Sequence, residues 1–129
     1  MRRLVDKIRG NAARIVRFEE EDTTGADVVV VSYGITSRVA RMGVELARET
    51  GAKVGILRLV VVWPFPETRI RELARQIKAF VVPEINYGQI VLEVERCAAG
   101  RAAAIHVPHG GGSVHDPEVI CQAILGAAR

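Results

Sequence analysis

The amino-acid sequence predicts a three-layer α/β/α fold, in which a mostly parallel sheet lies between two layers of helices. Short β-branched runs alternate with amphipathic stretches along most of the chain, a pattern typical of right-handed β-α-β units. The run Asp27–Ser32 contains four consecutive valines, as expected of a strand covered on both faces. With 129 residues, 49% of them apolar and 26% charged, the chain is expected to form one domain over residues 1–129.

Two elements are expected in residues 1–25, ahead of the repeating core. Leu4, Val5 and Ile8 fall at helical spacing, so the pattern predicts an amino-terminal helix over residues 2–12. Residues 15–19 then alternate between apolar and polar side chains, which predicts a short edge strand. The βα core is expected over residues 26–129.

The first half of the core is predicted as strand, helix, strand and helix. After the strand at 27–32, Thr36 or Ser37 is expected to cap a helix that ends at Gly51. A strand at 53–62 and a helix that begins at Pro66 follow. The residues expected to face the core are Val39, Met42, Leu46 and Ala47 in the first helix, and Ile70, Leu73, Ala74 and Ile77 in the second.

The second half repeats the alternation. Strands are predicted at 79–82 and 102–107, with a helix over 86–98 between them. Asp116 as N-cap and Pro117 at the first helical position predict the start of the last helix. The expected inward residues of these helices are Ile90, Val91, Val94, Cys97, Ile120, Ala123 and Ile124.

Composition excludes several classes of function. The net charge is only +3 and aromatic residues are few, so the chain has no stacking surface for nucleic acid. No apolar run approaches the ~20 residues that span a bilayer, and we expect a cytoplasmic protein without a membrane anchor. Cys97 and Cys121 lie on apolar helix faces and are expected to be buried thiols.

The turn at residues 84–89 is the strongest candidate for a site. Glu84 ends an apolar strand, and Asn86 can accept a hydrogen bond from the first turn of the next helix. Gln89 can reach back to the amide of Asn86, as in a capping box. Glu84 is therefore either an acid–base or partner-binding group, or a carboxylate held by the amides of the helix start.

A second candidate lies after the valine strand. Gly34, Thr36 and Ser37 combine a turn, two hydroxyls and a helix start, an arrangement that can hold an anion. The segment matches neither the phosphate-binding loop nor the dinucleotide fingerprint, and ordinary capping after a tight turn explains it equally well.

Two aromatic residues form the third candidate. Trp63 and Phe65 alternate with prolines after a predicted strand, so they either cover the end of the sheet or present a rigid apolar surface to another subunit. On the second interpretation they would also support a weak homodimer. The histidines at 106, 109 and 115 have loose spacing and no neighbouring cysteine, and we expect no metal site there.

Taken together, these segments resemble the carboxy-terminal domain of the α subunit of 2-oxoacid:ferredoxin oxidoreductases. That domain is of the same class as the carboxy-terminal domain of transketolase. The 2-oxoglutarate type is the most similar. The segments that carry the resemblance are residues 7–20, 27–37, 57–59, 63–66, 81–96, 110–112 and 116–118.

The resemblance implies a five-stranded sheet in the order 1-3-2-4-5. Its first strand, residues 15–19, would be antiparallel to the others. Residues 34–37 and 84–88 would form the bottom of a crevice at the point where the strand order reverses. The complete enzyme of this family uses thiamine diphosphate and iron–sulfur clusters to convert a 2-oxoacid into an acyl-coenzyme A, and it reduces ferredoxin.

No catalytic, cofactor-binding or metal residue of the family can be placed on this chain, since those residues belong to other domains. The resemblance therefore implies a non-catalytic assembly domain, with the β subunit and the amino-terminal α domain as its partners. Ferredoxin and coenzyme A would be met only through the complex. The alternative is a stand-alone module that binds a small anion in the crevice formed by residues 34–37 and 84–89.

Overall fold

The computed structural model describes residues 2–9, 14–34, 36–60, 65–84, 89–108 and 116–128; for 2–9, 14–17, 89 and 108 it describes the backbone only. In this part of the chain the strands are β1 (Arg2–Arg9), β2 (Arg14–Glu21), β3 (Val28–Tyr33), β4 (Val54–Leu59), β5 (Ala79–Glu84) and β6 (Ala103–Pro108). The helices are α1 (Thr36–Glu49), α2 (Glu67–Ala74), α3 (Gln89–Ala98) and α4 (Pro117–Ala127).

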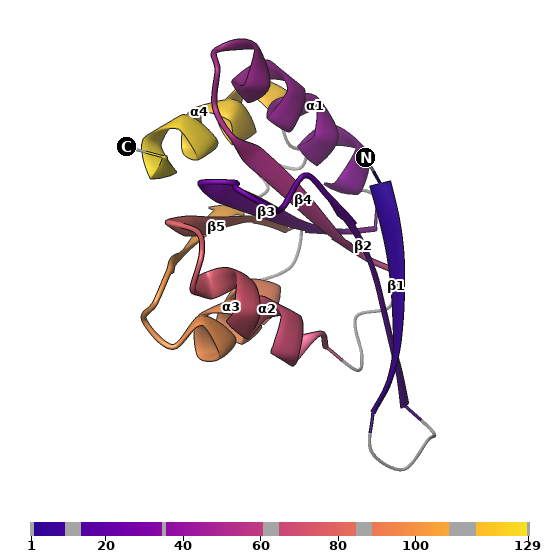
Figure 1. Cartoon of the computed structure of the whole chain (residues 1–129). Helices are drawn as coiled ribbons and strands as arrows, with labels where there is room; N and C mark the ends of the chain where they lie inside the picture. Colours follow the sequence, from indigo (N-terminus) through magenta and orange to yellow (C-terminus); the bar gives the residue numbers. More distant parts are fainter. Residues whose placement is uncertain are drawn as a thin grey trace.

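The described strands form one sheet in the order β1-β2-β4-β3-β5-β6. β2 pairs antiparallel with β4, whereas β4, β3, β5 and β6 are mutually parallel. Strands β2 to β6 therefore have the order and directions that the family resemblance implies, but β1 adds a sixth strand, so β2 is not the edge strand that was expected. Figure 1 shows the three layers, with α1 and α4 on one face and α2 and α3 on the other.

The valine strand lies at the centre of the sheet and is buried on both faces. Val29 and Val31 belong to the apolar cluster beneath α2 and α3, and Val28 and Val30 belong to the cluster beneath α1 and α4. This alternation follows from the period of two along a strand. It explains why the run contains no polar residue before Ser32.

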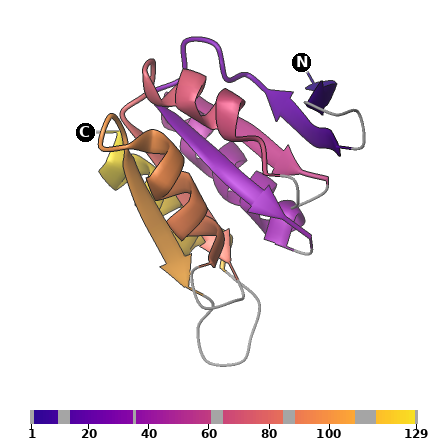
Figure 2. The same cartoon turned by 90° about the horizontal axis from the view of Figure 1, so that it is seen from below.

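The prediction of a helix over residues 2–12 is wrong. These residues include β1, which forms an antiparallel hairpin with β2, with Arg2 opposite Glu21 and Arg9 opposite Arg14. A short apolar pattern fits a helix and a strand equally well, and pairing with β2 extends the sheet at an edge that would otherwise be open. Figure 2 shows the hairpin at one edge of the sheet and β6 at the other.

The predicted apolar stripe of α1 is also partly wrong. Met42 is exposed, and the buried face of the helix consists of Thr36, Ala40, Gly43, Val44 and Ala47. The reason is the close approach of α4. A Cβ atom on Gly43 would lie 2.6 Å from Cγ2 of Ile120, so only glycine leaves room for this contact.

The other helices follow the sequence pattern. The core residues expected of α2 and α3 are buried, as are Ile120 and Ile124 of α4. The carboxylate of Asp116 accepts a hydrogen bond of 2.9 Å from the amide of Glu118, and Pro117 is the first residue of α4. Both features confirm the predicted start of this helix. No helix in the described ranges is long and apolar enough to span a bilayer.

Candidate functional site

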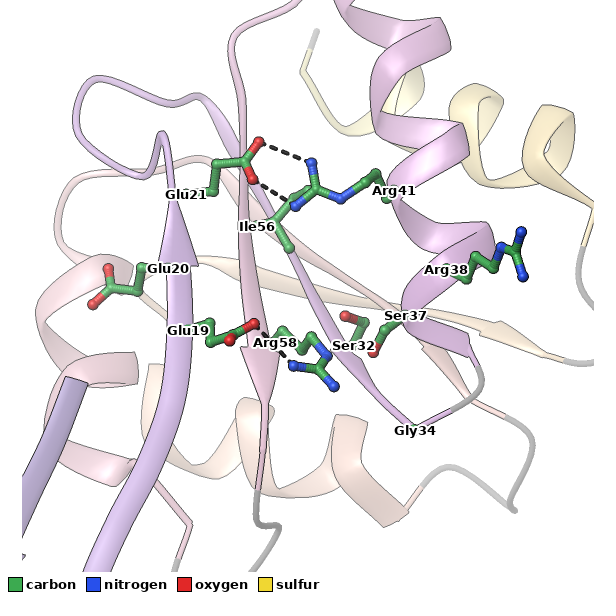
Figure 3. Close-up of a pocket in the computed structure, with 10 residues that line it drawn as sticks. All are labelled: Glu19, Glu20, Glu21, Ser32, Gly34, Ser37, Arg38, Arg41, Ile56 and Arg58. Carbon is green, nitrogen blue, oxygen red and sulfur yellow. Dashed lines mark hydrogen bonds and ion pairs between the residues drawn. The ribbon is translucent and has the colours of Figure 1, made fainter. Parts of the chain in front are cut away.

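A pocket of about 490 Å³ opens between the amino-terminal half of α1 and the strands β2 and β4 (Figure 3). It lies where β3 ends and α1 begins, and β2 and β4 form its other wall. The residues that line it are Glu19, Glu20, Glu21, Ser32, Gly34, Ser37, Arg38, Arg41, Ile56 and Arg58.

Two hydroxyl groups sit at the inner end of this pocket. Ser32 closes the valine run of β3 and is only 2% exposed, while Ser37 lies in the first turn of α1. Within the described part of the chain, neither Oγ atom has a hydrogen-bond partner, and both are buried. Figure 3 shows them beside each other, next to Arg58. Buried hydroxyls normally have a partner, so this pair is unusual.

Ion pairs neutralise the acidic side chains of β2 that face the pocket. Nη1 of Arg58 in β4 lies 2.9 Å from Oε1 of Glu19, the residue directly opposite it in β2. Arg41 of α1 makes a two-point contact with the carboxylate of Glu21. Figure 3 shows that Glu20 points away from both pairs.

Glu21 is held firmly in its charged form. Hydrogen bonds from Arg41 lower the pKa of Glu21 to about 2; burial opposes this shift, and a second hydrogen bond from Arg48 adds to it. The pair joins β2 to α1 across the mouth of the pocket. A carboxylate with a lowered pKa in the folded state stabilises the protein at neutral pH.

We therefore expect the contribution of Glu21 to stability to disappear in acid. It is fully present above the unfolded pKa of about 4.5 and is lost as the pH falls towards 2, because the proton must then bind to the paired carboxylate. Urea melts of the wild type and Glu21→Gln at pH 7 and pH 3 should show a difference in midpoint that shrinks at the lower pH. A difference in midpoint that is the same at both pH values would contradict the lowered pKa of Glu21. So would an equal change with pH in the variant Glu95→Gln, which replaces an exposed glutamate.

The candidate segment at residues 34–37 divides between structural and pocket roles. Gly34 has a φ of 63°, a left-handed conformation that favours glycine, and it lines the pocket together with Ser37. The hydroxyl of Thr36 instead donates to the carbonyl of Tyr33 at 2.7 Å and is buried. Thr36 therefore caps the turn, while Gly34 and Ser37 remain available to a ligand.

Glu84 takes the second of the two roles that the sequence allows. Its carboxylate is 4% exposed and accepts hydrogen bonds from the amides of Ile90 at 2.8 Å and Val91 at 3.0 Å. It thus occupies the amino end of α3, where the helix dipole favours a negative charge. Nε2 of His106 is 3.9 Å from the same carboxylate.

The pocket described here shares Gly34 and Ser37 with the expected crevice but not Glu84, and residues 85–88 of that crevice lie outside the described residues. Glu84 turns inward to the amides of α3, and β2 and β4 complete the pocket around Gly34 and Ser37. Asn86 lies outside the described residues. The described helix begins at Gln89, whose side chain is also outside them.

Phe65 covers the sheet. It is 2% exposed and belongs to the apolar cluster beneath α2 and α3, so the interpretation of Phe65 as a surface for a partner is wrong. A buried position follows from its place between β4 and α2, two elements that pack on the same core. Trp63 lies outside the described residues.

Both thiols are buried, as expected, and they lie on opposite faces of the sheet. Cys97 belongs to the cluster beneath α2 and α3 and Cys121 to the cluster beneath α1 and α4. Burial raises the pKa of each thiol. In the described ranges, no three His, Cys, Asp or Glu side chains form a metal-binding group; His109 and His115 fall outside these ranges.

Of the residues that line the pocket, sequence reasoning identified only Gly34 and Ser37, and it missed Ser32, Arg38 and Arg58 among the others. A signal for two of them exists, because Ser32 and Arg58 are the polar residues within strands that are otherwise apolar. Polar groups at such positions require a partner. The partner of Arg58 is Glu19 on β2, and only the sheet order places it there.

Comparison with protein families gives one match to most of the chain. Residues 26–120 match the model described as "Pyruvate:ferredoxin oxidoreductase core domain II". The 2-oxoglutarate synthase subunit KorA of Methanothermobacter marburgensis is 40% identical over 126 residues, which cover 98% of this chain and 34% of that protein. The chain thus spans about a third of the length of this relative.

Solved structures show the same fold. A 2-oxoglutarate:ferredoxin oxidoreductase from Magnetococcus marinus superposes with a TM-score of 0.73 and 24% identity, covering 87% of this chain and 20% of that one. A split-gene transketolase superposes with a TM-score of 0.71 and 18% identity, covering 81% and 39%. At these identities the likeness concerns the fold alone.

Proposed function

The chain belongs to the pyruvate:ferredoxin oxidoreductase core domain II family, and from this premise we propose that it is a non-catalytic assembly domain in the α subunit of a 2-oxoacid:ferredoxin oxidoreductase. The observation that carries the proposal is the 40% identity over nearly the whole chain with a 2-oxoglutarate synthase subunit. The same observation favours 2-oxoglutarate as the substrate of the complete enzyme.

In this proposal the complete enzyme oxidatively decarboxylates the 2-oxoacid to an acyl-coenzyme A and passes the electrons to ferredoxin. Thiamine diphosphate and the iron–sulfur clusters would be held by other domains and subunits. Two features of the chain support the proposal that other parts of the enzyme hold these cofactors. Glu84, the carboxylate expected beside the helix start, is already bound to amides of α3, and the two cysteines lie in separate apolar layers.

The proposed partners are the β subunit and the amino-terminal domain of the α subunit. Ferredoxin and coenzyme A would be met only through the assembled complex, in the cytoplasm. A second copy of the chain is a further proposed partner of the isolated domain. Since Phe65 is buried, Trp63 remains the aromatic anchor for that contact.

The isolated chain is expected neither to bind thiamine diphosphate nor to oxidise a 2-oxoacid. On this proposal, the groups that bind the cofactor and carry out the reaction belong to other parts of the enzyme. Isothermal titration calorimetry with the cofactor and Mg²⁺ measures binding directly, and reduction of ferredoxin measures turnover. Cofactor binding at micromolar strength would refute a purely assembling role, provided that circular dichroism shows a folded sample.

A further inference from the structure

The buried hydroxyls of Ser32 and Ser37 identify a second property of the domain. A hydroxyl removed from water without a partner costs folding free energy, and such groups are rare unless something binds to them. Both atoms lack a partner in the described part of the chain, and both residues line the same pocket. They are therefore available as donors to a bound molecule.

The charges around the hydroxyls select the sign of that molecule. Arg58 has several N–H donors, and its hydrogen bond to Glu19 uses Nη1. Arg38 also lines the pocket, and because Figure 3 shows its guanidinium directed away from the two hydroxyls, it adds positive charge without touching them. The amino end of α1 adds the positive end of its helix dipole, while Glu19 and Glu21 are already neutralised by arginines.

We propose that this pocket binds the carboxylate or phosphate group of a small organic anion, held by Ser32, Ser37 and Arg58 at the start of α1, with Arg38 adding positive charge nearby. Glu84 does not line this pocket. The proposal goes beyond the assembly role and does not depend on it, because it uses only side chains that this chain supplies.

The size and walls of the pocket narrow the ligand further. A volume of about 490 Å³ lies within the range of small-molecule sites, and a bare oxyanion would leave most of it open. On the wall opposite α1, Glu21 is already paired with Arg41, so a second negative group on the ligand would find no unpaired cation among the described residues there. The geometry therefore favours an anion with one charged end and a neutral remainder.

Titration of the ¹⁵N-labelled chain, followed by NMR, tests the proposal. Inorganic phosphate and acetate serve as separate probes, with sodium chloride at equal ionic strength as the reference. We expect saturable amide shifts confined to the start of α1, the end of β3 and the part of β4 around Arg58. The stronger of the two probes then identifies the oxyanion.

Ser32→Ala combined with Ser37→Ala is the decisive variant. It should weaken binding by about tenfold or more, because two hydrogen bonds to a charged group are lost. Its urea midpoint without ligand should equal or exceed that of the wild type, since the buried hydroxyls have no partner to lose. Arg38→Gln should also weaken binding, whereas Arg75→Gln, an exposed arginine at the end of α2 on the other face, should not.

Two results would overturn the proposal. One is the absence of a saturable shift with either probe, which would mean that water alone fills the pocket. The other is equal affinity in the wild type and the folded double serine variant, which would place any anion elsewhere on the surface.

Discussion

Replacing Arg69 with alanine is expected to lower the free energy of unfolding by about 3 kcal/mol, a typical loss when one partner of a buried ion pair is removed. Nε and Nη2 of Arg69 each lie 2.8 Å from a carboxylate oxygen of Glu20. Glu20 is only 5% exposed, and among the described side chains the variant would keep the 2.8 Å hydrogen bond from Thr23. A buried carboxylate would remain without a cation. Urea unfolding followed by circular dichroism measures the loss.

Arg96 provides the matched control, because it also pairs with two glutamates but its side chain is 52% exposed. Pairs of this kind contribute little, so Arg96→Ala should leave the midpoint close to that of the wild type. Replacing both Glu20 and Arg69 with apolar residues should recover part of the loss. If Arg69→Ala and Arg96→Ala behave alike, the Glu20 pair does not anchor α2 to β2.

The second large effect is expected at Glu84. Glu84→Ala should cost about 3 kcal/mol, because the amides of Ile90 and Val91 would both lose their acceptor in a buried place and each orphaned group costs about 1–3 kcal/mol. Glu84→Gln should cost less, since one acceptor oxygen remains. Loss of helical signal at 222 nm before global unfolding would identify α3 as the element affected.

Comparison with Asn86→Ala distinguishes the two candidate caps of α3. Loss of an ordinary N-cap costs about 1 kcal/mol, so the Asn86 variant should be the milder of the two. A larger loss at Asn86 than at Glu84 would mean that the helix start depends on the segment after β5 and not on the carboxylate at its end.

The parallel core could be predicted from sequence because its strands are buried on both faces. Val28–Val31 and the apolar residues of β4 and β5 leave few alternatives to a central strand, and the helices between them carry clear apolar stripes. The order β2-β4-β3-β5-β6 required more than periodicity, and it came from the family resemblance. Local pattern alone does not determine which strands become neighbours.

The errors occur where long-range contacts override local pattern. The spacing of Leu4 and Ile8 suits a helix, but pairing with β2 makes β1 a strand. The stripe of α1 shifts because α4 approaches at Gly43, a contact between residues far apart in the sequence. In both cases the deciding partner lies outside the window that periodicity samples.

The candidate site could be predicted only in part, because some of its residues also depend on contacts between distant parts of the sequence. The turn at Gly34 and the hydroxyl of Ser37 are visible in the sequence because a glycine precedes a helix start. Ser32 and Arg58 gain their meaning only when β3, β4 and β2 lie side by side, so that Glu19 opposes Arg58. Glu84 was correctly placed at a helix start, and its two hydrogen bonds decide between the roles that the sequence left open.

Reconstitution tests the central claim most directly. A 2-oxoglutarate synthase whose α subunit lacks the region equivalent to this domain would be mixed with the 129-residue chain and examined by size-exclusion chromatography and by 2-oxoglutarate-dependent ferredoxin reduction. The account predicts that the chain co-elutes with the α fragment and β subunit and that activity rises only in the mixture. A folded chain that stays separate while the truncated enzyme is fully active, or a chain that oxidises the 2-oxoacid alone, would contradict it.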